Sequence, residues 1–465
     1  MNKFKVAIIG GGPGGYVTAI RLQQYGIDTV VFEKERLGGV CLNHGCIPTK
    51  SLVKVADLYS EIKESEDYGI SIEKSDIDYL KVWQRKNDIV EKLVSGIEFM
   101  FKKRKIQIIN NAVIKILQVN SEYRINTDEE EYFADYVIVA TGSKPKELPF
   151  LKCNGKNILN SKDILKMEEL PQKLVIVGGG VIGCEFASIY NQLGVEVEIV
   201  EFLPNLIALE DIEISKRLAM SLKRSGIKVH LKTAVESFEE IASNIVLKLS
   251  NGKEIVTDKV LLSVGREPVM GIDFEDKLFC TNDVLIEIDS MMRTNLKNVF
   301  AIGDVTGKLM LAHTASKQGL IVADIIQNEV NNTDIEIIDL DYKKIPACTF
   351  TNPEIASVGY TQKEAEELFG EILIGKFPFS ANGKALGLGA TFGFVKVIAQ
   401  IDSKRLLGVH IIGPHATELI SQAGVLVGLN ATVDDVKKVV FAHPTLSEAV
   451  MEAVEDLEKL AIHKM

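Results

Sequence analysis

KVAIIGGGPGGYVTAIRLQQYGIDTVVFE, at Lys5–Glu33, predicts a strand, a glycine-rich turn, a helix and a second strand. The apolar run Lys5–Ile9 is typical of a buried strand, and helical apolar spacing follows the glycines. A G-x-G-x-x-G motif between a strand and a helix indicates a dinucleotide-binding unit. This stretch therefore predicts an α/β fold that begins with such a unit.

Each glycine of the motif has a separate expected role. Gly10 permits a tight turn, Gly12 lets the backbone approach a pyrophosphate, and Gly15 lets the helix and the strand pack closely. Glu33 ends the second strand, Thr29–Phe32, where its carboxylate can accept hydrogen bonds from two ribose hydroxyls. A glycine turn that holds no ligand is the alternative.

The chain then repeats this pattern at Lys173–Glu201, KLVIVGGGVIGCEFASIYNQLGVEVEIVE, 168 positions after the first copy (178 − 10 = 168). The residues that match Gly10, Gly12, Gly15 and Glu33 are Gly178, Gly180, Gly183 and Glu201. The repeat predicts a second dinucleotide site, unless its glycines serve packing alone.

Glu201 also predicts which nicotinamide cofactor the second site takes. Its carboxylate would repel a 2′-phosphate, and no Lys or Arg lies between Val200 and Ile214 to hold one. The sequence therefore favours NAD(H) over NADP(H).

Bulk composition indicates a large enzyme of several domains. The 465 residues are 46% hydrophobic and 25% charged, with a net charge of −11. This acidic balance argues against a nucleic-acid or anionic-membrane partner, and the basic run Lys102–Lys105 is expected to be the exposed end of a helix. Apolar runs are too short to span a bilayer, and the first strand starts too early for a targeting peptide, so we expect a cytoplasmic protein.

The two nucleotide-binding units end in similar strand-and-turn segments, which mark the domain boundaries. Ala134–Gly142, with Thr141 and Gly142 in its turn, closes the first nucleotide unit, and Asp258–Gly265 closes the second. We expect two Rossmann-like domains, then a central segment, then an α+β domain. The expected bounds are 1–150, 151–270, 271–341 and 342–465.

Later elements follow from apolar patterning. Strands are expected at Asn298–Asp304, Ile372–Phe377, Phe394–Ile401 and Gly408–Ile412, and a helix at Ala312–Asn328. The elements before residue 342 belong to the central segment, and the three later strands, followed by helices, predict a separate α+β domain from Tyr342 onward.

A close cysteine pair follows the first nucleotide loop. Cys41 and Cys46 lie in LGGVCLNHGCIPTK, with a spacing uncommon for zinc, and the other four cysteines supply no second pair, so no metal site is expected. Ile47 and Pro48 predict a helix start, so the helix dipole should stabilise a Cys46 thiolate, and Lys50 adds positive charge. We interpret the pair as redox-active, with two ordinary buried thiols as the alternative.

A proton acceptor is expected at His443 in the stretch FAHPTLSEA. Glu448 could accept a hydrogen bond from one ring nitrogen, leaving the other to take a thiol proton. Thr445 and Glu448 also form a capping-box pattern that would explain the glutamate equally well. His44, between the two cysteines, is a rival base.

Together these motifs resemble the FAD-dependent pyridine nucleotide disulfide oxidoreductases. The resemblance is carried by GGVCLNHGCIPTK at Gly38–Lys50, the two glycine loops, ATG at 140–142, GD at 303–304 and HPTLSE at 443–448. Motif order agrees over essentially the whole chain. The stretch Gly387–Phe394 departs from the family, because it is glycine-rich and apolar where relatives are more polar.

The resemblance implies two cofactors and a role for each site residue. It implies an FAD domain at 1–150 completed by 271–341, an NAD domain at 151–270 and a dimerisation domain at 342–465. FAD would be held by Gly10, Gly12, Gly15, Glu33, Lys50, Thr141, Gly142, Asp304 and Ala312, and NAD by Gly178, Gly180, Gly183, Glu201 and Gly265.

It also implies a reaction. Cys41 would exchange with substrate and Cys46 would face the flavin, while Lys50 pairs with Glu185. His443 and Glu448 would act on the disulfide of the other subunit of a homodimer. The members most similar to the chain oxidise dihydrolipoyl groups carried by a protein of a multienzyme complex and reduce NAD+. Alternatives are an NADH-dependent reductase of another disulfide, and a non-catalytic member of a complex.

Overall fold

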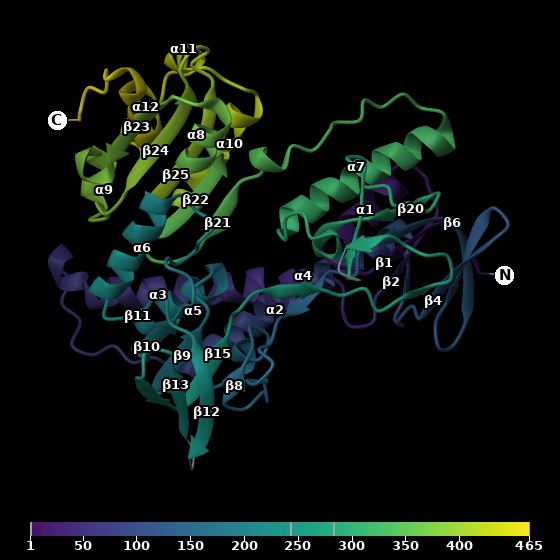
Figure 1. Cartoon of the computed structure of the whole chain (residues 1–465), viewed down its shortest axis with the longest axis horizontal. Coiled ribbons are helices and arrows are strands. Elements are labelled where there is room, and N and C mark those ends of the chain that lie inside the picture. The colour runs from purple at the N-terminus through teal and green to yellow at the C-terminus, as the bar shows by residue number, and fades with distance from the viewer. Residues whose placement is uncertain (1, 242–243, 282–283, 465) are drawn as a thin grey trace. The chain divides into compact units, whose positions relative to one another are not determined.

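The computed structural model describes residues 2–241, 244–281 and 284–464 and divides into two units (Figure 1). The first unit comprises Met1–Ser51, Lys81–Lys146 and Arg266–Tyr342. The second comprises Leu52–Leu80, Glu147–Gly265 and Lys343–Met465. Each unit is therefore assembled from three separate stretches of the chain.

The first unit is built on a mixed eight-stranded sheet with the order β17-β4-β5-β6-β1-β2-β3, in which β20 pairs with β6. Its strands are β1 (Lys3–Ile9), β2 (Thr29–Phe32), β3 (Gln107–Ile109), β4 (Lys115–Val119), β5 (Glu122–Asn126), β6 (Glu131–Val139), β17 (Asp273–Phe274) and β20 (Val299–Ala301). The central pairs β1–β2, β1–β6 and β6–β20 are parallel.

Both faces of this sheet are buried. Val6 and Ile8 of β1 belong to a core that includes residues of α1 (Pro13–Gln24), α4 (Tyr79–Arg104) and α7 (Ala312–Asn331). Ala7 and Ile9, which point the other way, belong to a second core with residues of β4, β5 and β6. Helices α1 and α7 pack against each other. The first glycine loop lies between β1 and α1, at the carboxyl end of a central strand.

Two helices form the cysteine region. They are α2 (Gly39–His44) and α3 (Cys46–Lys63), separated by Gly45.

The second unit contains a five-stranded parallel sheet with the order β11-β10-β9-β15-β8. Its strands are β8 (Ile158–Leu159), β9 (Lys173–Val177), β10 (Glu196–Val200), β11 (Lys228–His230) and β15 (Lys259–Leu262). Helices α5 (Val181–Gln192) and α6 (Ile212–Arg224) connect these strands, and β12 (Val235–Ile241), β13 (Asn244–Leu249) and β14 (Glu254–Thr257) form an antiparallel sheet. The second glycine loop lies between β9 and α5, as its repeat relation to the first loop predicts.

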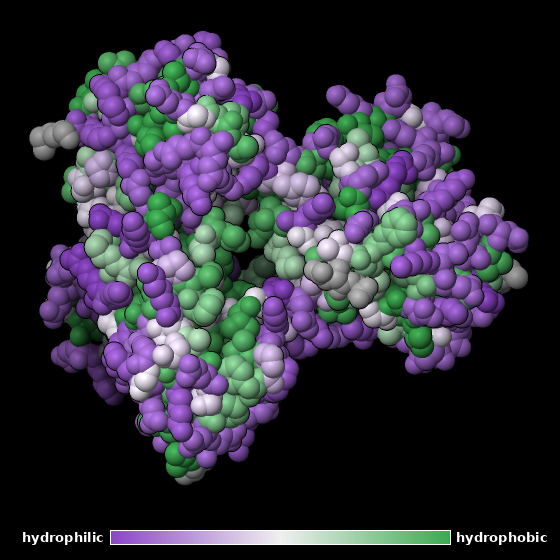
Figure 2. Space-filling view, viewed as in Figure 1, coloured by the Kyte–Doolittle hydropathy of each residue, from purple (hydrophilic) through white to green (hydrophobic). Residues whose placement is uncertain are grey.

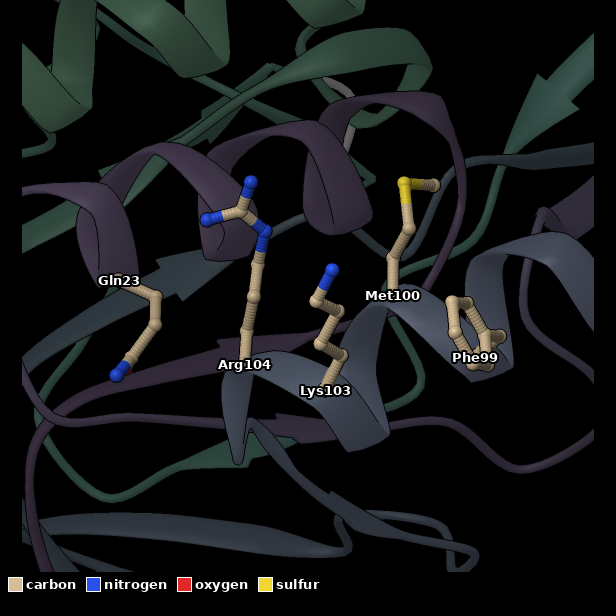
Figure 3. Close-up of a pocket in the computed structure, with 5 residues that line it drawn as sticks. All are labelled: Gln23, Phe99, Met100, Lys103 and Arg104. Carbon is tan, nitrogen blue, oxygen red and sulfur yellow. The ribbon is translucent and has the colours of Figure 1, made fainter.

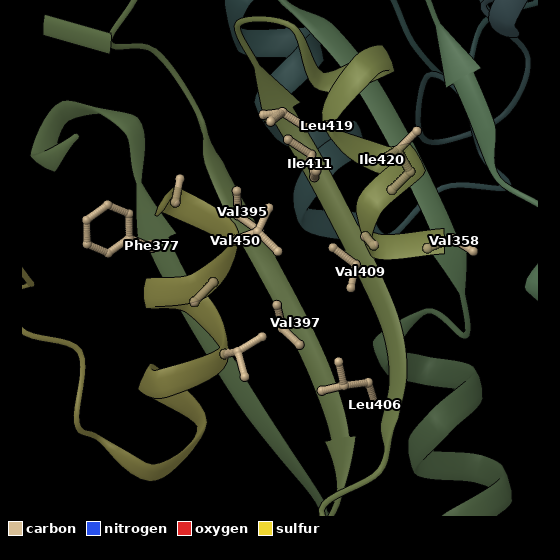
Figure 4. Packing of buried hydrophobic residues seen from close by; sticks show 14 of the residues in the cluster. Val358, Phe377, Val395, Val397, Leu406, Val409, Ile411, Leu419, Ile420 and Val450 are labelled. Atoms are coloured by element: carbon tan, nitrogen blue, oxygen red, sulfur yellow. The ribbon is translucent and has the colours of Figure 1, made fainter. Parts of the chain in front are cut away.

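The carboxyl-terminal part of the second unit is an antiparallel sheet, β21-β22-β25-β24-β23, with helices packed against it. The strands are β21 (Ala347–Thr349), β22 (Glu354–Gly359), β23 (Ile372–Pro378), β24 (Phe394–Gln400) and β25 (Leu406–Gly413); the helices are α8 (Gln362–Phe369), α9 (Gly383–Gly387), α10 (Ala416–Gly428), α11 (Val433–Lys437) and α12 (Glu448–Glu455). Figure 4 shows Val397 and Val409 on strands of this sheet, with Ile420 and Val450 on helices of the same core. The predicted α/β class with an α+β carboxyl-terminal part is confirmed.

A buried ionic network lies inside the second unit. The fully buried ammonium of Lys396 on β24 lies 3.0 Å from both carboxylate oxygens of Asp211, 2.8 Å from Glu213 and 2.7 Å from the Gln362 side chain. Burial alone would raise the pKa of Asp211, but His410, Lys396 and a backbone hydrogen bond outweigh it and leave the pKa below its usual value. The network therefore links Asp211, the N-cap residue of α6, to β24.

The surface agrees with the composition. Figure 2 shows hydrophilic side chains over most of the face in view, with smaller hydrophobic patches among them. The basic run Lys102–Lys105 is exposed at the end of α4, as predicted. Among the described residues, no helix has the length and apolar character needed to cross a membrane.

Candidate functional site

The first glycine loop has the geometry that each glycine predicts. Gly10 has φ +112°, and a Cβ there would lie 2.2 Å from the Ala140 carbonyl oxygen. A Cβ at Gly15 would lie 1.8 Å from the carbonyl oxygen of Gly10. At Gly12 the nearest atom to an added Cβ is Gly39 Cα, 3.9 Å away. Two glycines are therefore required by packing, whereas Gly12 leaves space for a ligand.

The second loop repeats this division of roles. Gly178 has φ +108°, and its added Cβ would lie 2.5 Å from the Ser263 carbonyl oxygen, while that of Gly183 would lie 2.0 Å from the Gly178 oxygen. Gly180 has no described atom within 4 Å of an added Cβ. Each loop thus has an open position before a helix N-terminus, where backbone amides can meet a pyrophosphate.

Glu33 and Glu201 each accept a hydrogen bond from the glycine loop of their own unit. The Gly11 amide donates to Glu33 Oε2 at 2.8 Å, and the Gly179 amide donates to Glu201 Oε2 at 2.5 Å. In both cases the other carboxylate oxygen accepts a hydrogen bond from the backbone amide two residues after the glutamate. A carboxylate has about four acceptor positions, so each still has capacity for ribose hydroxyls. The predicted ribose contacts stay a prediction.

A polar cluster lies in the same unit as the first glycine loop. Asp304 accepts a hydrogen bond from the Ser143 hydroxyl, and Arg266 donates to the Ser143 hydroxyl and carbonyl oxygens, both at 2.8 Å. Burial lowers the pKa of Arg266. Thr141 Oγ1 is buried and has no hydrogen-bond partner among the residues that the structure describes, and Gly142 has φ +75°.

These features of the first unit fit a flavin dinucleotide. The open position at Gly12 suits a pyrophosphate, and the unsatisfied Thr141 hydroxyl is a donor that a bound group can use. Ala312 is the first residue of α7, whose free amides add a further positive helix end. Sequence reasoning missed Ser143 and Arg266, although Ser143 directly follows the ATG turn.

The cysteine pair is brought together by the break between α2 and α3. Cys46 is the first residue of α3, as predicted, and Cys41 on α2 is hydrogen-bonded to it. The two sulfurs are not joined in a disulfide. The hydrogen bond to Cys46, burial and the Cys46 charge raise the pKa of Cys41, while Lys50 opposes them. Cys46 lies at the positive end of a helix, where the dipole favours a thiolate.

His443 and Glu448 meet in the second unit. His443 Nδ1 lies 2.9 Å from Glu448 Oε1, and Glu448 Oε2 accepts from the Thr445 amide at 2.8 Å. Burial alone would raise the pKa of Glu448, but the bonds from Thr445 and His443 outweigh it, so the pKa lies below its usual value. Helix α12 starts at Glu448 itself, and the Ser447 side chain makes no capping hydrogen bond to the described residues of the helix. Glu448 thus serves the histidine and the turn together.

The remaining predicted residues lie as follows. Glu185 is buried on α5, and its Oε1 accepts from the Phe350 amide at 2.9 Å. Lys50 lies one helical turn after Cys46, and its pairing with Glu185 stays a prediction. Gly265 follows β15 with φ +111° and open space around it. His44 Nε2 lies 3.6 Å from a Glu35 carboxylate oxygen.

Comparison with known families decides what this arrangement is. Residues 4–319 match the family described as pyridine nucleotide-disulphide oxidoreductase, and residues 345–454 match the dimerisation domain of the same family. The chain belongs to the pyridine nucleotide-disulphide oxidoreductases. The family predicted from the motifs is confirmed, and its members use FAD and NAD(H).

Relatives are similar over their full length. A Bacillus subtilis protein named dihydrolipoyl dehydrogenase is 39% identical, with 99% of each chain covered, and one from Zymomonas mobilis is 37% identical, with 99% of each covered. Among solved structures, LpdA from Mycobacterium tuberculosis is 25% identical with a TM-score of 0.88, covering 98% of this chain and all of that one. The flavoprotein disulfide reductase RclA from Escherichia coli, also 25% identical, gives 0.84, with 97% and 99% covered.

One surface cavity of this oxidoreductase lies apart from the predicted site residues. It has a volume of about 510 Å³ and is lined by Gln23 of α1 and by Phe99, Met100, Lys103 and Arg104 of α4 (Figure 3). No predicted site residue lines it. Within the described ranges, no group of three His, Cys, Asp or Glu side chains is placed to hold a metal ion.

Proposed function

We propose that this chain is a dihydrolipoyl dehydrogenase, which oxidises protein-bound dihydrolipoyl groups to the disulfide and reduces NAD+ to NADH. The observation that carries the proposal is the Cys41–Cys46 pair, with Cys46 at a helix N-terminus in the unit that holds the first dinucleotide loop. The names of relatives 37–39% identical over nearly the whole chain support the same substrate.

His443 is the proposed base. Because Glu448 accepts the hydrogen bond from Nδ1, the neutral ring carries its proton there and leaves Nε2 free to take one from a dihydrolipoyl thiol. The imidazolium that forms is stabilised by the adjacent carboxylate.

Thiol–disulfide exchange then takes place between the substrate and the cysteine pair. The substrate thiolate attacks Cys41 Sγ of the oxidised pair, a substrate–Cys41 bond forms, and Cys46 leaves as a thiolate. The second substrate thiol then attacks the substrate sulfur bound to Cys41, the bond between that sulfur and Cys41 Sγ breaks, and the lipoyl ring closes. Cys41 leaves as a thiol, carrying the proton that the attacking thiol loses. The substrate loses two electrons and the cysteine pair gains them. The α3 N-terminus and Lys50 stabilise the Cys46 thiolate.

Bound FAD would take the two electrons from the reduced pair and pass them to NAD+ as a hydride. We propose that it is held by residues of the first unit: Gly10, Gly12, Gly15, Glu33, Lys50, Thr141, Gly142, Asp304 and Ala312. The second loop, with Glu201 and Gly265, is proposed to hold NAD, and Lys50 to pair with Glu185.

The proposed assembly is a homodimer in which His443 and Glu448 of one copy act on the cysteine pair of the other. The family dimerisation domain at 345–454, which contains both residues, supports this arrangement. The substrate carrier is proposed to be a lipoyl-bearing protein of a multienzyme complex in the cytoplasm. The four-domain division given above is retained as part of the proposal.

The purified protein is expected to be yellow and to reduce NAD+ with dihydrolipoamide. The Glu201 carboxylate should make NADP+ a poorer acceptor by at least about tenfold in kcat/KM, the effect of about 1.4 kcal/mol of lost binding. NADH formation at 340 nm measures both rates. A parallel assay follows NADPH-dependent reduction of glutathione disulfide. Turnover in that assay alone would overturn the proposal, and NADH-dependent reduction of another disulfide without dihydrolipoamide turnover would favour the alternative function.

Replacing His443 by glutamine should lower dihydrolipoamide turnover by about 10²- to 10⁴-fold, because positioned proton transfer contributes that much to a rate. The matched variant His44→Gln removes the rival base between the cysteines. Steady-state kcat at pH 8 measures both. A large loss in His44→Gln with little change in His443→Gln would reverse the assignment of the base.

A further inference from the structure

A buried asparagine is hydrogen-bonded to the turn that carries the proposed base. Asn382, the N-cap residue of α9, is only 4% exposed. Its Nδ2 donates to the Thr445 carbonyl oxygen at 3.0 Å, and its Oδ1 accepts from the Ala385 amide at 2.9 Å. Both polar atoms of this side chain therefore make a hydrogen bond, one within α9 and the other to a distant part of the chain.

Thr445 connects Asn382 to the His443–Glu448 pair. The Thr445 amide donates to Glu448 Oε2 at 2.8 Å, and Glu448 Oε1 lies 2.9 Å from His443 Nδ1. The Thr445 hydroxyl donates to the Ala442 carbonyl oxygen at 2.8 Å. A connected series of hydrogen bonds therefore runs from the Asn382 side chain, through the Thr445 backbone and Glu448, to the His443 ring.

The position of the His443 ring depends on this turn. The His443 side chain is 79% exposed, and residues 442–447 lie between α11 and α12, outside both helices. A segment with few buried contacts is held mainly by the hydrogen bonds that it makes. Leu446 anchors the turn to the hydrophobic core, and Asn382 adds a polar anchor at the neighbouring residue.

The Asn382 donor is itself fixed on the core of the second unit. The Asn382 amide donates to the Phe379 carbonyl oxygen at 3.0 Å. Phe379 and Ala385, three residues before and after it, are fully buried and belong to the same hydrophobic cluster as Leu446. Because the Ala385 amide already orients the side chain, Nδ2 is held in place for the Thr445 carbonyl oxygen.

We propose that Asn382 is a positioning residue for His443. Its amide fixes the Thr445 carbonyl group, and with it the turn in which Glu448 orients the His443 ring. The proposal rests on the function proposed above, in which His443 is the base. It adds α9 to the elements that build the proton-accepting site.

Replacing Asn382 by serine separates the two hydrogen bonds of the side chain. Serine is as good an N-cap as asparagine, so α9 keeps its cap, but the shorter side chain does not reach the Thr445 carbonyl oxygen. The kcat for dihydrolipoamide should fall about tenfold while KM changes less than about twofold, because a misplaced base slows proton transfer and leaves substrate binding intact. An unchanged kcat would overturn the proposal.

Reduction of ferricyanide by NADH is the second readout. This acceptor takes single electrons from reduced flavin, two ferricyanide ions for each NADH, and needs no proton transfer from a thiol. Its rate in Asn382→Ser should equal that of wild type. Equal losses in the two assays would show a general loss of structure and would overturn the proposal. If Asn382→Ser does not fold, Asn382→Asp takes its place, because aspartate also caps α9 and also lacks the donor.

A double variant tests whether Asn382 acts through His443. In a His443→Gln background, Asn382→Ser should lower the kcat for dihydrolipoamide by no more than about twofold, because the group that Asn382 positions is already missing. A further tenfold loss would show an independent effect and would contradict the proposal. Asn328→Ser is the matched control, since Asn328 also accepts from a backbone amide and donates to a carbonyl oxygen, both of Ile335 and both at 2.8 Å. It should keep both wild-type rates.

Amide hydrogen exchange separates this inference from the proposed function. Without substrate, a peptide covering residues 441–449 should exchange about fivefold faster in Asn382→Ser, because the turn loses a hydrogen bond that protects it. The same peptide should exchange at the wild-type rate in Asn328→Ser. If wild type fails to turn over dihydrolipoamide, the proposed function fails, while this exchange still decides the role of Asn382. Unchanged exchange in Asn382→Ser would show that Asn382 does not position the turn.

Discussion

Replacing Cys46 by serine is expected to abolish dihydrolipoamide turnover, with a loss of at least about 1000-fold. Serine cannot form the disulfide that the substrate thiolate must break, and its hydroxyl is far too weak an acid to leave as an anion. At about 1.4 kcal/mol for each factor of ten, the loss corresponds to about 4 kcal/mol of barrier. The rate of NADH formation with dihydrolipoamide measures it.

Cys280→Ser is the matched control, because Cys280 is a half-buried cysteine in the short strand β18 (Cys280–Thr281), with no role in the proposed relay. It should retain wild-type turnover. The flavin absorbance of both variants reports whether the protein has folded and loaded its cofactor. A yellow Cys46→Ser protein that keeps a tenth or more of the wild-type rate would show that the relay does not use this pair.

Replacing Lys396 by methionine should destabilise the protein by about 3–5 kcal/mol, the usual cost of leaving a buried charge without its partner. Lys396 is fully buried, and it holds the 1% exposed Asp211 through two hydrogen bonds of 3.0 Å. The midpoint and slope of a urea unfolding curve give the change in unfolding free energy.

Lys376→Met is the comparison for this effect, since Lys376 contacts Glu213 at 2.6 Å but keeps a 38% exposed side chain. Its loss should cost no more than about 1 kcal/mol, as exposed ion pairs do. A double variant, Lys396→Met with Asp211→Leu, should recover much of the lost stability, because no unpaired charge then stays buried. Equal losses in Lys376→Met and Lys396→Met would contradict the network as described.

Local patterns in the sequence predicted much of the fold. The strand Thr29–Phe32 has the predicted bounds, and the helix expected at Ala312–Asn328 runs to Asn331. Helix α3 begins at Cys46, as Ile47 and Pro48 indicated. Such features depend on neighbouring residues, through apolar spacing, proline geometry and glycine turns. The sequence could not separate a histidine partner from a capping box at Glu448, because Glu448 contacts both His443 and the Thr445 amide.

Contacts between distant residues were not predictable in this way. Arg266 reaches Ser143 across 123 positions, and Lys396 reaches Asp211 across 185. Nothing in the local pattern of either partner indicates such a contact, because strand pairing and domain packing bring the residues together. The anchoring of His463 by Glu452 was missed although only 11 positions separate them. The His463 side chain is exposed, whereas the Glu452 carboxylate that it contacts is buried.

Strand β20 has a consequence for how this protein is made. It pairs in parallel with β6, and Ile302 and Gly303 connect it to Asp304, yet the second glycine loop is translated between the two strands. On the ribosome, the nascent first unit therefore has the Val137–Val139 end of β6 unpaired on one side until Val299–Ala301 has emerged, because β5 covers only the first half of that edge. An open strand edge of this kind is a template for wrong pairing. Translation must supply about 300 residues before the flavin half of the site can close, so this period is when the nascent chain most needs protection from aggregation.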